Sequence, residues 1–278
     1  MRLGGRVFHD CSTPEAWVAG LRKHGYSAAY CPVDASASDD VVQAYAEAAA
    51  SADIVIAEVG AWSNPISPDE ATRKAALDKN IQALALADSI GALCCVNISG
   101  ARCEQWDGPH PDNLTEATFE LVVETVRRII DAVKPTRAFY TLETMPWAFP
   151  DSADSYLRLI KAIERDHFAV HLDPVNLISS PHRYFANAEF LRECFAKLRP
   201  WIKSCHAKDI HLSGKLTVHL EETRPGLGAL DYGTYLRELG RLAPDTPLMI
   251  EHLSAEEDFA AAAEHIRTVA AQEGVEIR

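Results

Sequence analysis

The sequence predicts a single (β/α)8 TIM barrel, and three observations lead to this expectation. Short apolar or β-branched runs alternate with longer segments that are rich in Ala, Leu, Glu and Arg and have helical spacing. The length of 278 residues suits this architecture, because α/β barrels routinely occupy about 250 residues as one domain. No linker rich in Pro or Gly divides the chain. We therefore expect one domain over residues 1–278.

Eight apolar runs are the strand candidates. They cover residues 6–9, 27–32, 54–60, 92–99, 138–143, 168–173, 202–206 and 248–251. The first run is the least regular, because Gly4 and Gly5 interrupt it. No run is followed by GxGxxG or GxxxxGK[ST], which argues against an open nucleotide-binding sheet.

Helical segments separate these runs. The first begins at residue 14 or 39 and ends at 50, and the others cover 68–90, 115–133, 151–165, 183–198, 232–242 and 255–271. Ser67-Pro68-Asp69-Glu70 and Asp151-Ser152 supply the capping residues, first-turn proline and early acids that are typical of helix starts. Eight strands with their helices match a closed barrel better than an open sheet.

Composition excludes several classes of partner. Lys and Arg total 27 against 40 Asp and Glu, a formal charge of −13, so binding by phosphate neutralisation is not expected and nucleic acid is excluded as a partner. No apolar stretch approaches the roughly 20 residues that span a bilayer, and no secretory signal is visible, so we expect no membrane partner. Seven cysteines without a CxxC pair favour a reducing, cytoplasmic location.

Four strand ends each carry one strong metal ligand. The segments LETMPW, HLDPVN, SCHAKD and MIEH contain Glu143, Asp173, His206 and Glu251. The interval from Glu143 to Asp173 and that from Asp173 to His206 each correspond to one βα unit. The longer interval from His206 to Glu251 includes an inserted loop over residues 213–231. Because strand ends meet at one face of a barrel, these side chains are expected to converge. Three carboxylates and an imidazole suit Mn²⁺, Mg²⁺ or Co²⁺, and Zn²⁺ is also compatible.

Each of these residues has an ordinary structural interpretation when taken alone. Asp173 before Pro174 suits a helix cap, and a lone His206 is more often a hydrogen-bonded core histidine. Four such residues on four successive strands are harder to explain in that way. Three buried carboxylates would repel one another unless a cation or protonation neutralised them.

These four segments, together with Arg224-Pro225-Gly226-Leu227-Gly228-Ala229-Leu230-Asp231, resemble the sugar phosphate isomerase/epimerase superfamily, the xylose isomerase-like TIM barrels. Its members include ketose 3-epimerases, hydroxypyruvate isomerases and inosose dehydratases. HxKD on the seventh strand and PGxGxxD before the eighth carry the resemblance. It implies that Glu143, Asp173, His206 and Glu251 bind the metal, and that Glu143 and Glu251 act from opposite sides of the substrate as the acid/base pair.

Two positions depart from the ketose 3-epimerases. Those enzymes carry a substrate-contacting histidine three residues after the sixth-strand aspartate, where this chain has Asn176. They also use a glutamate six residues after the fifth-strand ligand, where this chain has Phe149. The resemblance therefore implies the superfamily and leaves the particular reaction open.

The expected activity is metal-dependent isomerisation or epimerisation of a keto-sugar or sugar derivative by proton transfer through an enediolate. A metal-dependent dehydratase of the inosose dehydratase type is the alternative. An endonuclease IV relative is disfavoured by the acidic charge and the four-ligand set, and a sugar-binding barrel without activity by the retention of all four ligands.

Amide, cationic and aromatic side chains near the strand ends are the candidate sugar contacts. They are Trp62, Asn97, Asn176, Lys208 and Arg224. Trp62 could equally be loop packing, Lys208 could pair with the adjacent Asp209, and Arg224 could form an ion pair with Glu221 or Glu222. The expected partner is a small sugar, and a homo-oligomer remains compatible with the sequence.

Overall fold

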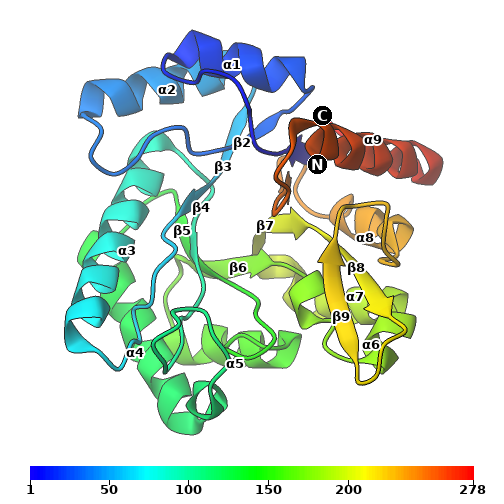
Figure 1. The fold of residues 1–278 in the computed structure, drawn as a ribbon. Helices are drawn as coiled ribbons and strands as arrows, with labels where there is room; N and C mark the ends of the chain where they lie inside the picture. Colours follow the sequence, from blue (N-terminus) through cyan, green and yellow to red (C-terminus); the bar gives the residue numbers. More distant parts are fainter.

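The computed structural model describes residues 1–278 and contains a closed barrel of eight parallel strands with helices around it (Figure 1). Around the barrel the strands follow the order β1-β10-β7-β6-β5-β4-β3-β2, and β2 pairs again with β1. Their bounds are Arg2–Gly4 (β1), Ala28–Tyr30 (β2), Val55–Gly60 (β3), Cys94–Asn97 (β4), Phe139–Glu143 (β5), Phe168–Leu172 (β6), Ile202–Ala207 (β7) and Pro247–Ile250 (β10). The predicted (β/α)8 barrel is confirmed.

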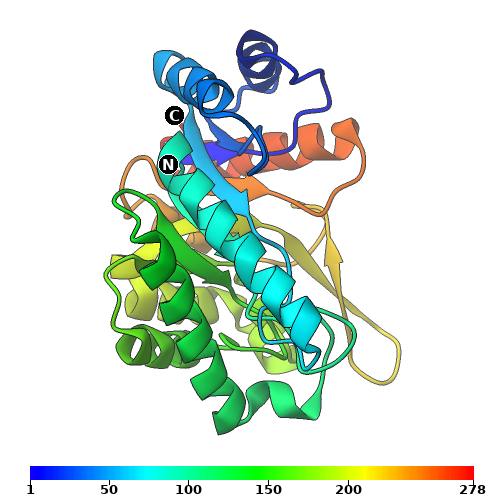
Figure 2. The same cartoon turned by 90° about the vertical axis from the view of Figure 1, so that its left-hand side faces the viewer.

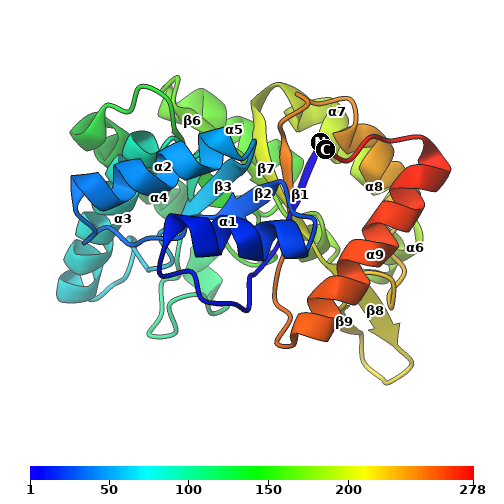
Figure 3. The same cartoon turned by 90° about the horizontal axis from the view of Figure 1, so that it is seen from above.

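The helices lie outside the barrel (Figure 3). They are α1 (Pro14–Lys23), α2 (Asp39–Ser51), α3 (Glu70–Ile90), α4 (Glu116–Val133), α5 (Ala153–Ile163), α6 (Pro181–Phe185), α7 (Asn187–Leu198), α8 (Tyr232–Leu239) and α9 (Glu256–Glu273). Asp69 and Ser152 accept backbone hydrogen bonds as the N-caps of α3 and α5. The two alternative starts predicted for the first helix, residues 14 and 39, are the starts of two separate helices, α1 and α2. The helix predicted over 183–198 is divided at Ala186 into α6 and α7. None of the helices has the length and apolar character needed to cross a membrane.

The prediction for the first strand is wrong by a few residues. The strand is Arg2–Gly4, whereas residues 6–9 belong to the loop that follows it. A side chain at Gly4 would overlap the carbonyl oxygen of Ala28 and the Met249 side chain, so glycine ends this strand where two neighbouring strands approach closely. Arg2 is buried there because Asp53 and Asp245 lie 2.8 and 2.9 Å from its guanidinium nitrogens.

The inserted segment is more ordered than a loop. Asp209–Ser213 (β8) and His219–Thr223 (β9) form an antiparallel hairpin that projects from the barrel (Figure 2). The buried carboxylate of Asp209 then accepts backbone hydrogen bonds from Gly226, Gly228 and Leu230 at 2.9 to 3.0 Å. The HxKD and PGxGxxD motifs therefore contact each other directly. Their hydrogen bonds hold the segment 224–231, the returning loop, against the start of the hairpin.

A large apolar core joins the outward-facing strand side chains to the helices. Inside the barrel the apolar part is small and consists of Ala28, Ala57 and Met249. The small side chains of Ala28 and Ala57 leave room beside them for polar groups. The carboxyl ends of the strands can therefore hold a buried polar site.

Candidate metal centre and active site

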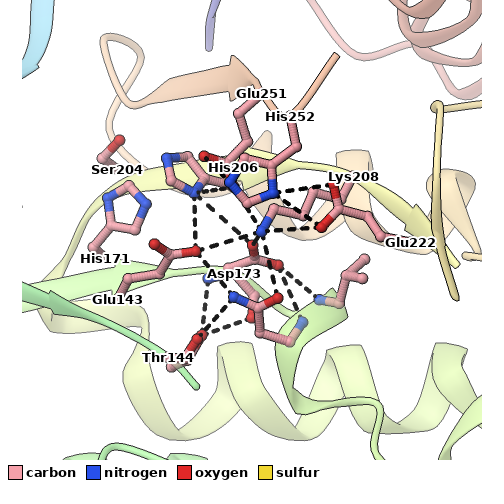
Figure 4. A network of polar contacts seen from close by, with 12 residues as sticks. Glu143, Thr144, His171, Asp173, Ser204, His206, Lys208, Glu222, Glu251 and His252 are labelled. Atoms are coloured by element: carbon pink, nitrogen blue, oxygen red, sulfur yellow. Dashed lines mark hydrogen bonds and ion pairs between the residues drawn. The ribbon is translucent and has the colours of Figure 1, made fainter. Parts of the chain in front are cut away.

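Alternation along four strands directs the predicted ligands into the barrel. On β5, β6, β7 and β10 the residues Leu142, Leu172, Cys205 and Ile250 belong to the outer apolar core. Their neighbours must face the other way, because successive side chains of a strand point to opposite faces. Those neighbours are Glu143, Asp173, His206 and Glu251, and they meet at the strand ends (Figure 4).

His206 lies at the middle of this cluster. Its Nδ1 is 2.8 Å from Oε1 of Glu251, 3.3 Å from Oε1 of Glu143 and 3.8 Å from Oδ2 of Asp173. The four candidate ligand atoms all lie within 4.8 Å of one another. Metal–ligand distances of roughly 2.0 to 2.2 Å produce separations of this size between the ligands of one ion. The geometry therefore allows one cation to contact all four side chains.

The donor atoms also fit a divalent cation. Oδ2 of Asp173 and Oε1 of Glu251 are buried and have no aligned hydrogen-bond partner, although each lies 2.7 Å from the ammonium nitrogen of Lys208. Buried carboxylate oxygens without hydrogen bonds are costly unless a cation neutralises them. Three carboxylates and one imidazole are the set that oxygen-preferring divalent ions accept.

The charges of the cluster are strongly coupled. Burial opposes ionisation of Glu143 and Glu251, but His206 and Lys208 outweigh it and hold the pKa of Glu143 well below its usual range and that of Glu251 at about 2. Burial raises the pKa of Asp173 to about 7. Burial also lowers the pKa of His206, yet Glu251, Glu143 and Glu58 raise it well above its usual value. The cluster thus contains more acidic side chains than basic ones, since His206 and Lys208 face four carboxyl groups.

Lys208 belongs to this cluster and does not pair with Asp209. Its side chain is almost fully buried, and besides Asp173 and Glu251 its ammonium nitrogen lies 3.4 Å from Oδ1 of Asn176 and 3.5 Å from Glu222. Asp209 faces the opposite way and binds the returning loop. Lys208 directly follows β7 and points to the same side as His206, two residues before it.

A second group of polar side chains contacts His206 on its Nε2 side. Its central residue is Glu58, which was not predicted from the sequence. Oε1 of Glu58 is 3.3 Å from Nε2 of His206, and Oε2 is 3.5 Å from Nδ1 of His171 and accepts a hydrogen bond from Ser204. A carboxylate behind a ligating imidazole fixes the tautomer and orientation of the ring. Burial lowers the pKa of His171 to about 4, so this ring is neutral at pH 7.

Glu58 turns inward because the pairing of β2 and β3 is irregular. Ala29 pairs with Ile56 and Tyr30 with Glu58, so Ala57 is an extra residue in β3. A bulge of this kind changes which face the following side chains occupy. The available sequence signal was a single acid inside the apolar run 54–60.

A cavity of about 450 Å³ opens above the cluster. Its lining includes three tryptophans and the two glutamates of the candidate cation centre, namely Trp62, Trp106, Trp147, Glu143 and Glu251. Glu222 of β9 and His252 also border it and contact each other at 3.0 Å, so the hairpin contributes to the wall. Glu222 was not among the predicted site residues.

Three of the five predicted sugar contacts line this cavity, namely Trp62, Asn176 and Lys208. Asn97 does not, because its buried amide bonds the backbone N–H and carbonyl oxygen of Ser63 at 3.1 and 3.2 Å. Arg224 does not either, and its partners are Asp258, at 3.5 Å, and the Pro225 carbonyl oxygen. Neither substrate contact in this cavity nor the alternative ion pair with Glu221 or Glu222 is therefore found for Arg224.

The two positions that depart from ketose 3-epimerases differ in their surroundings. Asn176 donates hydrogen bonds to Oε1 of Glu143 at 3.0 Å and to the Thr144 carbonyl oxygen. Phe149 is buried against Phe119 and does not line the cavity. This wall of the cavity therefore carries an amide at one position and no carboxylate at the other.

The fold and the site define a (β/α)8 barrel with a candidate cation centre at the carboxyl ends of its strands. The chain belongs to the xylose isomerase-like TIM barrel family, whose model matches residues 18–269. No protein of curated function matches the sequence.

Solved structures with low sequence identity share the fold. A xylose isomerase-like TIM barrel protein from Mycobacterium smegmatis in complex with magnesium is 18% identical with a TM-score of 0.66, covering 94% of this chain and 90% of that one. The 3-keto-D-glucoside 4-epimerase YcjR of E. coli is 13% identical with a TM-score of 0.72, covering 98% and 99%. The probable 3-DHS dehydratase AsbF of Bacillus anthracis is 15% identical with a TM-score of 0.66, covering 91% and 92%.

Proposed function

We propose that this protein is a divalent-metal-dependent isomerase or epimerase of a keto-sugar or sugar derivative. The observation that carries the proposal is the arrangement of Glu143 and Glu251 around the cluster. The barrel order β10-β7-β6-β5 puts Asp173 and His206 between the strands that bear these two glutamates. A substrate in the cavity would therefore meet one carboxylate on each side.

Proton transfer is the chemistry that this arrangement suits. Isomerising a hydroxy-ketone requires a base that removes a proton beside the carbonyl and an acid that returns one to another atom or face. One of the two glutamates, in its ionised form, would remove the proton, and the other, in its protonated form, would return one to the substrate. Each carboxylate has a second oxygen that can face the substrate while the first remains in the cluster.

The cation would be held by Glu143, Asp173, His206 and Glu251. A divalent ion bound there would act as a Lewis acid toward charge that develops on the substrate oxygens. Lys208 would donate a hydrogen bond to a substrate hydroxyl or carbonyl group. Asn176, whose amide N–H groups already bond Glu143 and Thr144, would border the substrate and orient Glu143. Trp62 would contact the apolar face of the sugar.

Several features support this assignment without deciding the substrate. YcjR is an epimerase of a keto-glucoside and AsbF a probable dehydratase, and both reactions can begin by removing a proton next to a carbonyl. The seven free cysteines suit a reducing compartment such as the cytoplasm. The amide of Asn176 and the buried Phe149 favour a substrate other than those of the ketose 3-epimerases.

The decisive experiment measures solvent deuterium uptake by a panel of keto-sugars in the presence of Mn²⁺. Wild-type protein is expected to incorporate deuterium at a carbon beside the carbonyl of one substrate. Glu143→Gln and Glu251→Gln should each lower the exchange rate by about 100-fold or more, because general acid–base catalysis contributes roughly 10²–10⁴-fold. Glu124→Gln, on the exposed face of α4, is the matched control and should leave exchange unchanged.

Near-normal exchange in either site variant would contradict the proton-transfer roles. Product analysis of the same reactions separates the two reaction types, since an isomerase or epimerase conserves the substrate mass whereas a dehydratase releases water. Removing divalent ions with EDTA should abolish exchange, and Mn²⁺, Mg²⁺ or Co²⁺ should restore it. Undiminished exchange after complete metal removal would contradict the role of the cation.

A further inference from the structure

A second group of metal-binding side chains lies outside the cavity, where the first part of the chain meets the last helix. His9 is in the loop after β1, His24 is the C-cap of α1, and Glu256 is the first residue of α9. One ligand atom from each lies within 4.8 Å of the other two. We propose that His9, His24 and Glu256 form a structural binding site for Zn²⁺ that is separate from the candidate centre inside the barrel.

The distances between the ligand atoms suit one ion. Nε2 of His24 is 3.4 Å from Oε1 of Glu256, and Nε2 of His9 is 3.7 Å from the same oxygen. Two ligands of a tetrahedral zinc ion are roughly 3.4 Å apart when each bond is about 2.0 to 2.1 Å long. Two imidazoles and one carboxylate form a nitrogen-rich set, which favours Zn²⁺ over the Mg²⁺ or Mn²⁺ that an oxygen-rich set prefers.

The histidine nitrogens are available as ligands. The side chain of His24 is only 8% exposed, and its Nε2 has no hydrogen-bond partner. A buried ring nitrogen without a partner is unfavourable, and a bound cation would satisfy it. Nε2 of His9 lies 2.6 Å from the ammonium of Lys23, which can only donate, so this nitrogen must be the acceptor and carries its lone pair toward the group.

Lys23 occupies the position where the ion would bind. Its ammonium lies 2.6 Å from Nε2 of His9 and 3.4 Å from Oε1 of Glu256. The side chain is 59% exposed and its stem is flexible, so it can turn away into solvent. Lys23 is therefore a competitor of the cation, and removing its charge should strengthen binding.

The site would reinforce the join between the two ends of the chain. β1 has three residues, and α1 and α9 lie on the same side of the barrel (Figure 3). Arg267 of α9 already donates hydrogen bonds to the carbonyl oxygens of His24 and Gly25, at 2.8 and 3.0 Å. A cation on His9, His24 and Glu256 would add a second link between α9 and the first βα unit, and would stabilise the fold by mass action.

The test uses full-length protein from which metal has been removed, with Zn²⁺ as the probe and calorimetric titration and the melting temperature as readouts. The Glu251→Gln background weakens the candidate centre in the barrel, and the part of the remaining binding that His9→Ala or His24→Ala removes reports on the second site. In this background Zn²⁺ should bind and raise the melting temperature. Adding His9→Ala or His24→Ala should weaken binding at least tenfold and remove most of that rise.

Two further variants sharpen the experiment. Lys23→Met should bind Zn²⁺ several-fold more tightly than its parent, whereas His182→Ala, an exposed histidine on α6, should bind as the parent does. His9 is in a partly exposed loop, so His9→Ala tests the site even where His24→Ala disturbs folding. Binding and melting shifts that are unchanged in His9→Ala, or weaker binding in Lys23→Met, would overturn the proposal.

Discussion

The ammonium nitrogen of Lys208 lies 2.7 Å from Oδ2 of Asp173, an oxygen that a cation in the candidate centre would also contact. The same nitrogen lies 2.7 Å from Oε1 of Glu251. Lys208 therefore stabilises the carboxylates in the absence of a cation. When a cation binds, the lysine must move or share its partners.

This contact predicts that Lys208→Met increases affinity for divalent ions. Two positive charges about 4 Å apart repel by roughly 4 kcal/mol at an effective dielectric constant of 20, and movement of the lysine reduces that penalty. We expect Mn²⁺ to bind at least tenfold more tightly to the metal-free variant, measured by calorimetric titration. Lys74→Met, exposed on α3, is the control, and equal affinities of wild type and Lys208→Met would contradict the competition.

Asp209 is expected to be important for stability. Its carboxylate accepts four backbone hydrogen bonds, including one from Ile210 at 2.8 Å. At about 1 kcal/mol for each bond, Asp209→Ala should lower the free energy of unfolding by roughly 3 to 4 kcal/mol. Urea unfolding measures this change, with Asp78→Ala on the exposed face of α3 as the control. Limited proteolysis should then cut the segment 224–231, and a variant as stable and resistant as wild type would contradict this role.

Asn97 and Trp62 should differ in what their loss affects. Asn97 bonds the Ser63 backbone, so Asn97→Ala should lower the free energy of unfolding by about 1 to 3 kcal/mol.

Trp62 lines the cavity and is partly exposed, so Trp62→Ala should leave stability nearly unchanged and raise KM for the substrate identified by deuterium exchange. Thermal melts and steady-state kinetics check both. A stable Asn97→Ala protein with an altered KM would show that the amide contacts substrate.

The stability of the α4–β5 connection should depend on pH through Asp88. Its carboxylate accepts backbone hydrogen bonds from Thr136, Arg137 and Ala138 at 2.7 to 2.9 Å. Burial opposes ionisation, but these bonds outweigh it and lower the pKa of Asp88. The stabilisation is thus present above the unfolded-state pKa of about 3.9 and is lost as the pH falls through the lower folded-state value.

We expect wild-type protein to exceed Asp88→Asn in free energy of unfolding by about 1 kcal/mol at pH 6, a modest value because the side chain is partly exposed to solvent. The difference should shrink toward pH 3. Urea titrations of both proteins at several pH values measure it. A difference that grew on acidification would contradict the assignment.

The fold and the four clustered side chains were predictable because they depend on local patterns. The two-residue alternation of a strand and its end at a loop are both readable in LETMPW, HLDPVN, SCHAKD and MIEH. Glu58 was missed because its inward direction depends on the bulge at Ala57, which exists only in the pairing of β2 with β3. The first strand was misplaced because Gly4 marks a close approach between strands and not an interruption.

The sequence by itself determined the (β/α)8 architecture and the inward direction of Glu143, Asp173, His206 and Glu251, since periodicity is a property of each segment alone. Only the tertiary structure decided which side chains Asn97, Lys208 and Arg224 contact. These contacts join segments far apart in the chain, so they follow from how loops pack over the barrel mouth. A polar side chain binds whichever partner that packing brings within hydrogen-bonding distance, and no local pattern specifies it.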